Sequence, residues 1–285
     1  MPRAVIDSEP AFAKVNLALH VRARRDDGFH ELDTLFAFAD DGDQLAVLGE
    51  TGARGEIRLT MRGPFANELS DGPDNLVVRA ALLLQERSGT SQGALLVLDK
   101  KLPVASGLGG GSTDAAAALR LLNRYWKVGY PIESLTVLAR ELGSDVPACL
   151  LGGTALGSGR GDILTPIHNE LKGAPMLLVN PRIAVSTGSV FAAWDGIDRG
   201  PLPGDTASVI VKQGRNDLAG PAIAICPLIA DSLASLAVHR PIVSRMSGSG
   251  ATCFALFTSE STRDTAREAI IGAHPDWWTM ACRLL

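Results

Sequence analysis

The sequence has few cysteines and no cysteine spacing typical of a zinc site. Its 285 residues include four cysteines, Cys149, Cys226, Cys253 and Cys282, which are far apart and form no CxxC pair. Disulfide frameworks and zinc sites need cysteines in recurrent, closely spaced patterns. We therefore expect buried free thiols rather than a disulfide-stabilised or zinc-binding protein.

Long apolar runs and runs of basic residues are also lacking. The longest apolar stretches, such as 80–84 and 253–257, are far shorter than the roughly 20 residues needed to span a bilayer. The first residues, MPRAVIDSEP, contain no apolar signal segment. The net charge is −4 without any Lys/Arg run, which argues against a nucleic-acid or membrane partner. We expect a cytoplasmic protein, for which small anionic substrates remain possible.

Glycine, by contrast, is in excess. The chain has 30 glycines, where an average content of about 7% would give about 20. Many of them lie in three segments: SGLGGGST at 106–113, GGTALGSGRG at 152–161 and SGSG at 247–250. A Gly-X-Y period is missing and 46% of the residues are hydrophobic, so collagen and disorder are both excluded.

Hydrophobic periodicity predicts a mixed order of strands and helices. Strands are expected at 13–21, 44–48, 56–61, 94–98, 154–156, 176–179, 253–257 and 279–284. Helices are expected from an N-cap at Asp74 to near Gly89, and at 113–126, 131–142, 185–194, between 205 and 238, and at 263–273. The length suggests two domains or one large one. We place two domains at 1–160 and 161–285, and 195–204 is predicted to be a loop.

The segment 106–113 is typical of a phosphate-binding loop, because glycines leave backbone N–H groups accessible and a helix start favours an anion. It is not a Walker A loop, since Gly111 rather than Lys precedes Ser112. A dinucleotide fingerprint also fits poorly, because Ser112 takes the sixth position and a helix opens at Pro131. A flexible loop with a helix cap is the structural alternative. Ser112, Thr113 and Asp114 could add ligands for phosphate or Mg²⁺.

Two further segments supply charged groups. Lys14 and Asn16 are two residues apart in a strand, so their side chains share a face that could hold an anion or a hydroxyl. A solvated Lys on an edge strand is the alternative. Asp145 precedes Pro147 and could be an N-cap as readily as a catalytic carboxylate. The turn at 247–250, taken by itself, could equally be a hairpin or a bulge.

Together these segments resemble the GHMP kinases, and the resemblance covers nearly the whole chain. It is carried by AKVNL at 13–17, DGFHELDTLF at 27–36, DNLVVRAA at 74–81, LPVASGLGGGSTDAA at 102–116, GSDVP at 143–147 and SGSGA at 247–251. It implies a two-domain α/β (α+β) fold, with an N-terminal mixed sheet and helices and a smaller C-terminal ferredoxin-like domain. It also implies that ATP and substrate bind in the cleft between the domains.

The activity implied by the resemblance is phosphorylation by ATP, with Mg²⁺, of the 2-hydroxyl of a methylerythritol linked to cytidine diphosphate, a step of non-mevalonate isoprenoid synthesis. Asp145 would be the general base, and Lys14 would orient it and stabilise developing charge. Phe29 and Phe191 would clamp the cytosine and His30 would contact its polar edge. Without the resemblance, the two phenylalanines would be expected in the core and His30 on the surface.

The remaining site residues are also implied by the resemblance. Polar contacts near the substrate would come from Asn16 and Thr187. The turn at 247–251 would approach the reacting centre, whereas no role is implied for 152–161. The ATP-binding residues would be Pro103, Val104, Ala105, Ser106, Gly107, Leu108, Gly109, Gly110, Gly111, Ser112 and Thr113.

Two alternatives of different kinds remain. Another GHMP kinase could act on a sugar, homoserine or a mevalonate-type alcohol, but such a substrate needs no cytosine clamp, and DGFH and Phe191 favour one. An inert ATP-binding or metabolite-binding regulator could keep the glycine loop, but the presence of both Lys14 and Asp145 argues against it. The sequence leaves open whether the protein is a monomer or a homodimer.

Overall fold

The computed structural model describes residues 4–51 and 54–285. These residues form two compact units: 4–13, 41–51, 54–104 and 109–152 in the first, and Lys14–Asp40, Ala105–Leu108 and Gly153–Leu285 in the second. Each unit is discontinuous because two long strands, β1 (Asp7–Arg24) and β2 (His30–Gly49), contribute residues to both. A single cut near residue 160 does not describe these units, and the expected boundary between two family domains stays a prediction.

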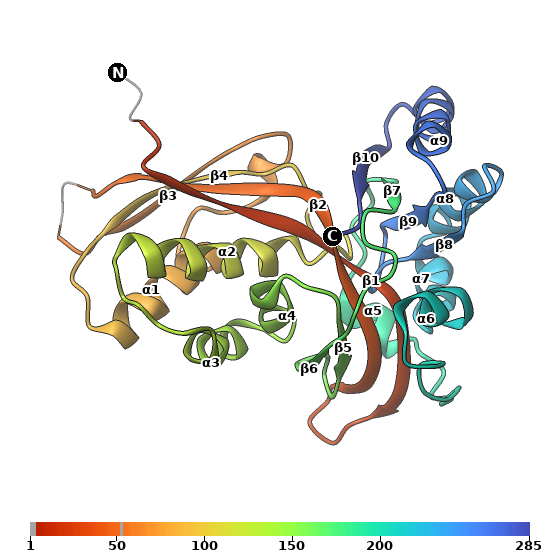
Figure 1. The fold of residues 1–285 in the computed structure, drawn as a ribbon, viewed down its shortest axis with the longest axis horizontal. Coiled ribbons are helices and arrows are strands. Elements are labelled where there is room, and N and C mark those ends of the chain that lie inside the picture. The colour runs from red at the N-terminus through yellow and green to blue at the C-terminus, as the bar shows by residue number, and fades with distance from the viewer. Residues whose placement is uncertain (1–3, 52–53) are drawn as a thin grey trace. The chain divides into compact units, whose positions relative to one another are not determined.

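In the first unit, helices pack on a small mixed sheet. β3 (Ile57–Arg62) runs parallel to β4 (Ala94–Asp99), which pairs antiparallel with the second half of β2. The helical segments are η1 (Ala66–Glu68), α1 (Leu76–Ser88), α2 (Gly110–Tyr125), α3 (Ile132–Leu142) and α4 (Val146–Leu151). α1 packs against β3, and α2 contacts the other three α-helices (Figure 1). The small side chains of 115–118 are fully buried, so the backbone of α2 can approach its neighbours closely.

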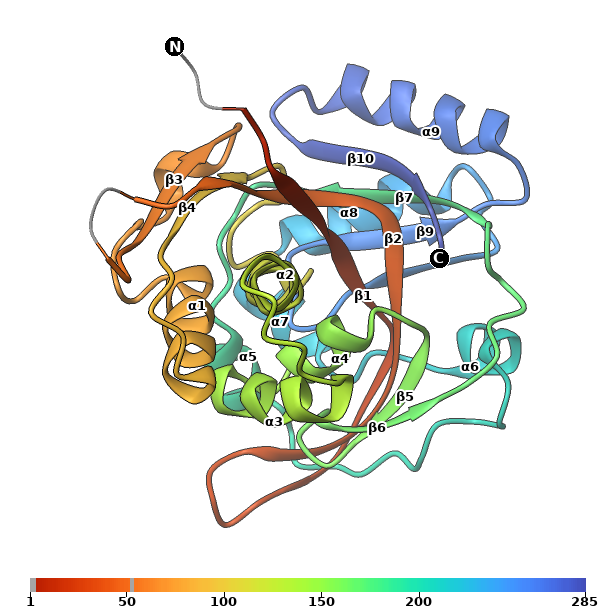
Figure 2. The same cartoon turned by 60° about the vertical axis from the view of Figure 1, so that its left-hand side comes forward.

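In the second unit, the first half of β2 pairs with β5 (Ala155–Ser158), and β5 pairs with β6 (Ile163–Pro166). A separate antiparallel sheet has the order β10 (Trp278–Arg283), β7 (Pro175–Asn180), β9 (Cys253–Leu256), β8 (Val243–Met246). Its helices are α5 (Thr187–Ala192), α6 (Ala207–Gln213), α7 (Ala219–Ile225), α8 (Leu228–Ala237) and α9 (Glu260–Ala273). α8 and α9 pack against this sheet (Figure 2), and Leu177, Val179 and Phe257 lie in the resulting core.

Two predictions at helix starts are wrong. The N-cap of α1 is Asn75 rather than Asp74: Asn75 has an extended backbone, and its side-chain oxygen accepts a hydrogen bond from the N–H of Val77. α2 begins at Gly110, three residues before the predicted start at Thr113. The reason is that Gly109 adopts the left-handed conformation, and its carbonyl accepts the N–H of Thr113 at 2.8 Å, which closes the first turn.

Residues 30–43 form most of β2, although no strand was predicted there. Leu35, Phe36, Ala37, Phe38 and Ala39 are all buried, so this part of the strand is covered on both faces. The polar–apolar alternation that indicates a half-exposed strand is therefore absent.

Candidate functional site

The end of the glycine loop in the first unit is the start of a long helix. Gly109 is the N-cap of α2 with φ +62°, and Gly111 in the first turn is exposed. The first N–H groups of a 16-residue helix have no helical partners and carry partial positive charge. This end of the loop therefore has the geometry that suits a phosphate, and binding of phosphate here stays a prediction.

The middle of the loop, Ala105–Leu108, belongs to the second unit and rests on the turn at 247–250. Gly107 has φ +79°, and a Cβ there would lie 2.9 Å from the carbonyl oxygen of Gly250. The hydroxyl of Ser247 donates to the carbonyl of Gly107 at 2.8 Å, and the N–H of Thr252 donates to the carbonyl of Ser106 at 3.0 Å. The second glycine-rich segment therefore supports the first by close backbone contact.

Asn16 is held by the same turn. Its N–H donates to the hydroxyl of Ser247 at 3.1 Å, and its side-chain NH₂ donates to the hydroxyl of Thr34 at 2.8 Å. The bond to Thr34 orients the side-chain amide. Oδ1 of Asn16 is buried and has no hydrogen-bond partner among the described residues. A ligand hydroxyl or amine could donate to it.

Lys14 lies in the interior of the second unit, which argues against the alternative of a solvated edge-strand lysine. It is 3% exposed, and its Nζ lies 5.0 Å from the ring centroid of Phe36. The third glycine cluster makes room for that ring: a Cβ at Gly157 would lie 2.5 Å from Cε2 of Phe36, and one at Gly161 would lie 3.3 Å from Cζ. Residues 152–161 thus acquire a role that the sequence did not reveal, because the Phe36 ring on which the cation lies needs their missing side chains.

Aromatic rings gather around His30. Its ring centroid lies 4.9 Å from that of Phe191 at a tilt of 37°, and 5.7 Å from Trp194, edge to face. Burial, with a smaller contribution from the charge of Arg24, lowers the pKa of His30, which favours the neutral imidazole. Nε2 of His30 is buried without a partner among the described residues. Trp194 is a neighbour that the sequence analysis missed.

The other predicted site residues of the second unit have different surroundings. The ring of Phe29 is 49% exposed and lies 4.9 Å from the guanidinium carbon of Arg160, whereas Phe191 packs against the ring of His30. The hydroxyl of Thr187 lies 2.9 Å from that of Ser249. The turn at 247–250 therefore contacts Gly107, Asn16 and Thr187 from three segments that are remote in sequence.

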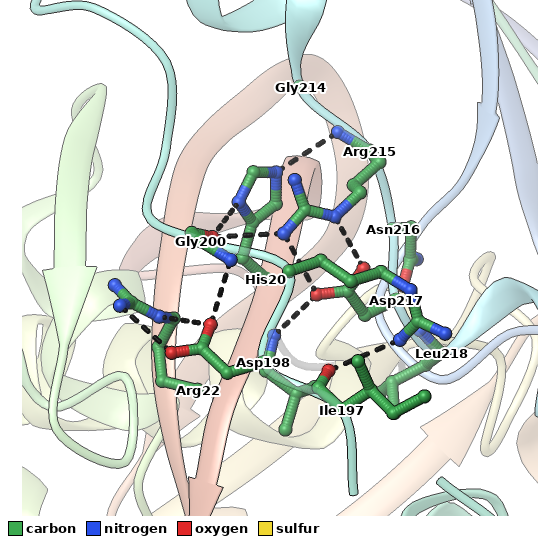
Figure 3. A network of polar contacts seen from close by, with 12 residues as sticks. His20, Arg22, Ile197, Asp198, Gly200, Gly214, Arg215, Asn216, Asp217 and Leu218 are labelled. Atoms are coloured by element: carbon green, nitrogen blue, oxygen red, sulfur yellow. Dashed lines mark hydrogen bonds and ion pairs between the residues drawn. The ribbon is translucent and has the colours of Figure 1, made fainter. Parts of the chain in front are cut away.

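Figure 3 shows the network that fastens the loop after Trp194 to β1. Arg215 donates to the carbonyl of Gly200 at 2.9 Å and to the carboxylate of Asp217 at 2.6 Å. The N–H of Arg215 also donates to Nε2 of His20, which fixes the proton of His20 on Nδ1, facing the carbonyl of Gly200 at 3.0 Å. Burial lowers the pKa of His20, which favours this neutral form. The predicted loop at 195–204 is thereby fixed in position near the ring cluster of His30.

In the first unit, Asp145 occupies the N-cap position of α4, and Pro147 lies in the first turn. The side chain of Asp145 makes no capping hydrogen bond. Helix capping, the alternative considered above, therefore does not explain the presence of Asp145 at this position. Asp114, a candidate Mg²⁺ ligand, is instead buried against the ammonium group of Lys100 at 2.6 Å. The hydroxyl of Thr113 donates to the carbonyl of Gly110 at 2.9 Å, and Ser112 is half-buried in the first turn of α2.

Within the described parts of the chain, no group of three or more His, Cys, Asp and Glu residues is arranged to hold a metal ion. None of the helices formed by those residues is long and apolar enough to cross a membrane. The carboxylates near the loop thus do not form a protein-only metal cage. A Mg²⁺ ion that arrives with a nucleotide needs fewer protein ligands, because phosphate oxygens and water supply most of its shell.

Family models match both parts of the chain. The model of the GHMP kinases N terminal domain matches residues 75–153, and that of the GHMP kinases C terminal domain matches residues 210–276. The fold and the glycine loop therefore define an ATP-dependent kinase of the GHMP class. The predicted two-domain GHMP kinase fold is confirmed.

Relatives that match nearly the whole chain identify the particular family within the GHMP kinases. The 4-diphosphocytidyl-2-C-methyl-D-erythritol kinase of Rhizorhabdus wittichii is 50% identical over 282 residues, 97% of this chain and 94% of the relative. The kinase of the same name from Sphingopyxis alaskensis is 48% identical over 278 residues, 96% of each chain. A crystal structure of 4-(cytidine 5'-diphospho)-2C-methyl-D-erythritol kinase matches with a TM-score of 0.80 at 33% identity, covering 98% of this chain and 99% of the other. The chain belongs to the family of 4-diphosphocytidyl-2-C-methyl-D-erythritol kinases, as its motifs predicted.

A more distant match agrees on the fold. Homoserine kinase from Cytophaga hutchinsonii matches with a TM-score of 0.70 at 20% identity, covering 100% of this chain and 97% of the other. At this identity the likeness concerns the fold alone and carries no information about the substrate.

Proposed function

We propose that the chain transfers the γ-phosphoryl group of ATP to the 2-hydroxyl of 4-diphosphocytidyl-2-C-methyl-D-erythritol, for isoprenoid precursor synthesis by the non-mevalonate route. One structural observation supports this proposal most directly. Five buried side-chain atoms lack a hydrogen-bond partner among the described residues, and three of them belong to Asn16, His30 and Ser106. Each of these residues was expected to contact substrate or nucleotide. Buried polar atoms are normally paired. Hydrogen bonds to bound substrate and nucleotide would explain why these three atoms have no partner within the protein.

In the proposed mechanism, Asp145 accepts the proton of the substrate's 2-hydroxyl while the hydroxyl oxygen attacks the γ-phosphorus. ADP leaves with the electrons of the broken P–O bond. The charge of Lys14 orients the base and offsets the negative charge of the transition state. The N–H groups at the start of α2 and the hydroxyl of Ser106 bind phosphate oxygens. Positioning and charge neutralisation of this kind supply most of the catalysis in phosphoryl transfer.

Magnesium fits this arrangement as an ion brought by ATP. The hydroxyl of Ser112 is the protein ligand that we propose, because Asp114 is already paired with Lys100. When bound, Mg²⁺ would neutralise charge on the β- and γ-phosphates.

Recognition of the cytidine group is assigned to the ring cluster of His30 and Phe191, with Phe29 as the second ring of the clamp. A neutral imidazole offers one donor and one acceptor nitrogen, so it can pair with the amino and ring-nitrogen edge of cytosine. Asn16 and Thr187 would contact the remaining polar groups of the substrate. The enzyme is further proposed to work in the cytoplasm, since all four cysteines are buried and none forms a disulfide, as fits a reducing compartment.

A substrate comparison tests the proposal. Purified protein is incubated with ATP, Mg²⁺ and one alcohol at a time, and ADP release is measured with 4-diphosphocytidyl-2-C-methyl-D-erythritol, galactose, homoserine and mevalonate. We expect turnover with the cytidine-linked alcohol alone. Comparable turnover with mevalonate or homoserine would show that the protein has the substrate specificity of another GHMP kinase. Binding of ATP without turnover of any alcohol would favour the alternative of an inert ATP-binding regulator.

A further inference from the structure

A buried ion cluster lies next to the glycine loop in the first unit. Nζ of Lys100 is 2.5 Å from Oδ2 of Asp43 and 2.6 Å from Oδ2 of Asp114. The three side chains are 1%, 0% and 3% exposed, respectively. Burying charges away from water is costly even when they are paired, so a cluster of this kind calls for a reason other than stability.

The cluster connects the two ends of the loop. Lys100 directly follows β4, and Asp114 lies in α2, so the ammonium group ties the end of the strand to the helix that the loop enters. The other oxygen of Asp43 accepts the N–H groups of Lys101 at 2.6 Å and Leu102 at 2.8 Å. The chain is thus fixed immediately before the loop and immediately after it.

The ammonium group also lies close to the backbone of the helix start. A Cβ at Gly110 would be 3.0 Å from Nζ of Lys100. The first residue of α2 therefore lies directly beside the buried cation, and a movement of Lys100 would be passed to the N–H groups that we assign to phosphate.

The charges within the cluster depend on Lys100. Burial opposes the charge on its amine, but the carboxylates of Asp114 and Asp43 keep the pKa of Lys100 above its ordinary value. Without the ammonium group, two carboxylates would face each other away from water, and the helix start would lose its tie to β4.

We propose that Lys100 is a positioning residue for nucleotide binding, which acts through Asp43 and Asp114 to hold the start of α2 in the orientation that binds phosphate. The inference rests on the phosphate-binding role proposed for the loop. It requires that loss of the tie weakens binding of the nucleotide while binding of the alcohol and the chemical step change little.

The first experiment compares Lys100→Met with Lys100→Arg and with a matched control, Lys101→Met. Lys101 is the next residue, but its side chain is 48% exposed and 3.5 Å from Asp41. The dissociation constant of a non-hydrolysable ATP analogue with Mg²⁺ is measured by calorimetry, alongside KM for both substrates and kcat. For Lys100→Met we expect the dissociation constant and KM for ATP to rise about tenfold or more, which corresponds to about 1.4 kcal/mol. Lys100→Arg should recover part of the loss, and Lys101→Met should match the wild type.

A second pair of variants keeps the test decisive if Lys100→Met does not fold. Asp114→Ala cuts the link to α2 but leaves one cation and one carboxylate, so the buried charge is balanced. Asp114→Asn is also balanced and keeps an oxygen that can accept from Lys100. We expect Asp114→Ala to weaken binding of the ATP analogue about tenfold, and Asp114→Asn to stay within about threefold of the wild type.

Two results would overturn the inference. One is a folded Asp114→Ala protein that binds the ATP analogue as tightly as the wild type. The other is a loss of kcat in proportion to the unfolded fraction at an unchanged dissociation constant, which is the signature of a purely structural cluster. Wild-type protein that fails to bind the analogue at all would instead contradict the proposed function, and the inference with it.

Discussion

Gly107→Ala is the sharpest single-residue test of the contact between the glycine loop and the turn at 247–250. Gly107 has φ +79°, and an added Cβ would meet the carbonyl oxygens of Ser247 and Gly250, the latter at 2.9 Å. Both obstacles are backbone atoms that cannot rotate away. The loop or the turn would therefore have to move.

The magnitude follows from two contributions. A left-handed backbone costs a non-glycine residue roughly 1–2 kcal/mol. Displacing the loop also breaks the hydrogen bonds to the carbonyls of Gly107 and Ser106 from Ser247 and Thr252, each worth about 1 kcal/mol. We expect the free energy of unfolding to fall by about 3–4 kcal/mol.

Gly129→Ala is the matched control. Gly129 has a similar φ of +74°, but an added Cβ would meet nothing within 4 Å, so only the backbone cost of roughly 1–2 kcal/mol remains. Unfolding by urea gives the free energies of both variants, and calorimetry gives the affinity of folded Gly107→Ala protein for an ATP analogue, which should be reduced. Equal losses of stability in the two variants, together with an unchanged nucleotide affinity, would refute the reasoning.

Two further predictions concern the proposed chemistry and recognition. Asp145→Asn removes the proton acceptor but not the loop, so kcat should fall by about 10²–10⁴-fold while the dissociation constant of an ATP analogue, measured by calorimetry, stays within about twofold of the wild type; near-normal turnover of the folded variant would end the assignment of Asp145 as base. Phe191→Ala and Phe29→Ala should each raise KM for the cytidine-linked alcohol more than they lower kcat in steady-state assays, because stacking stabilises the ground state and the transition state alike. An unchanged KM in both variants would argue against an aromatic clamp.

Much of the fold was predictable because the signals are local. Gly89 ends α1 with φ +69°, and Pro131 stands at the N-cap of α3, as expected from the preference of these residues for helix ends. The N-cap of α1 was misplaced by one residue because Asp74 and Asn75 have equally suitable side chains, and only the backbone conformation distinguishes them. The strand at 30–43 was missed because burial on both faces removes the alternation on which such a prediction depends.

The candidate site divides in the same way. Lys14, Asn16, His30 and the glycine loop could be proposed from the sequence because their motifs are contiguous. The contacts that support these residues could not be predicted, because their partners are remote in sequence. Ser247 lies 231 residues from Asn16, and Asp43 lies 57 residues from Lys100. Neither Asp43 nor Lys100 carries a local signal that separates it from an ordinary surface charge. Trp194 was missed for the same reason, since its proximity to His30 arises only in the folded chain.

The excess of glycine illustrates which properties can be predicted from the sequence and which are seen only in the tertiary structure. Composition alone located three glycine-rich segments, the motifs predicted close backbone approach for two of them, and the motif order identified the family. Only the tertiary structure decided what approaches each segment: the turn at 247–250 beneath Gly107, the ring of Phe36 beside Gly157, and the ammonium group of Lys100 beside Gly110. The sequence shows where a glycine leaves space beside the backbone. The atoms that fill this space come from segments that only folding brings close.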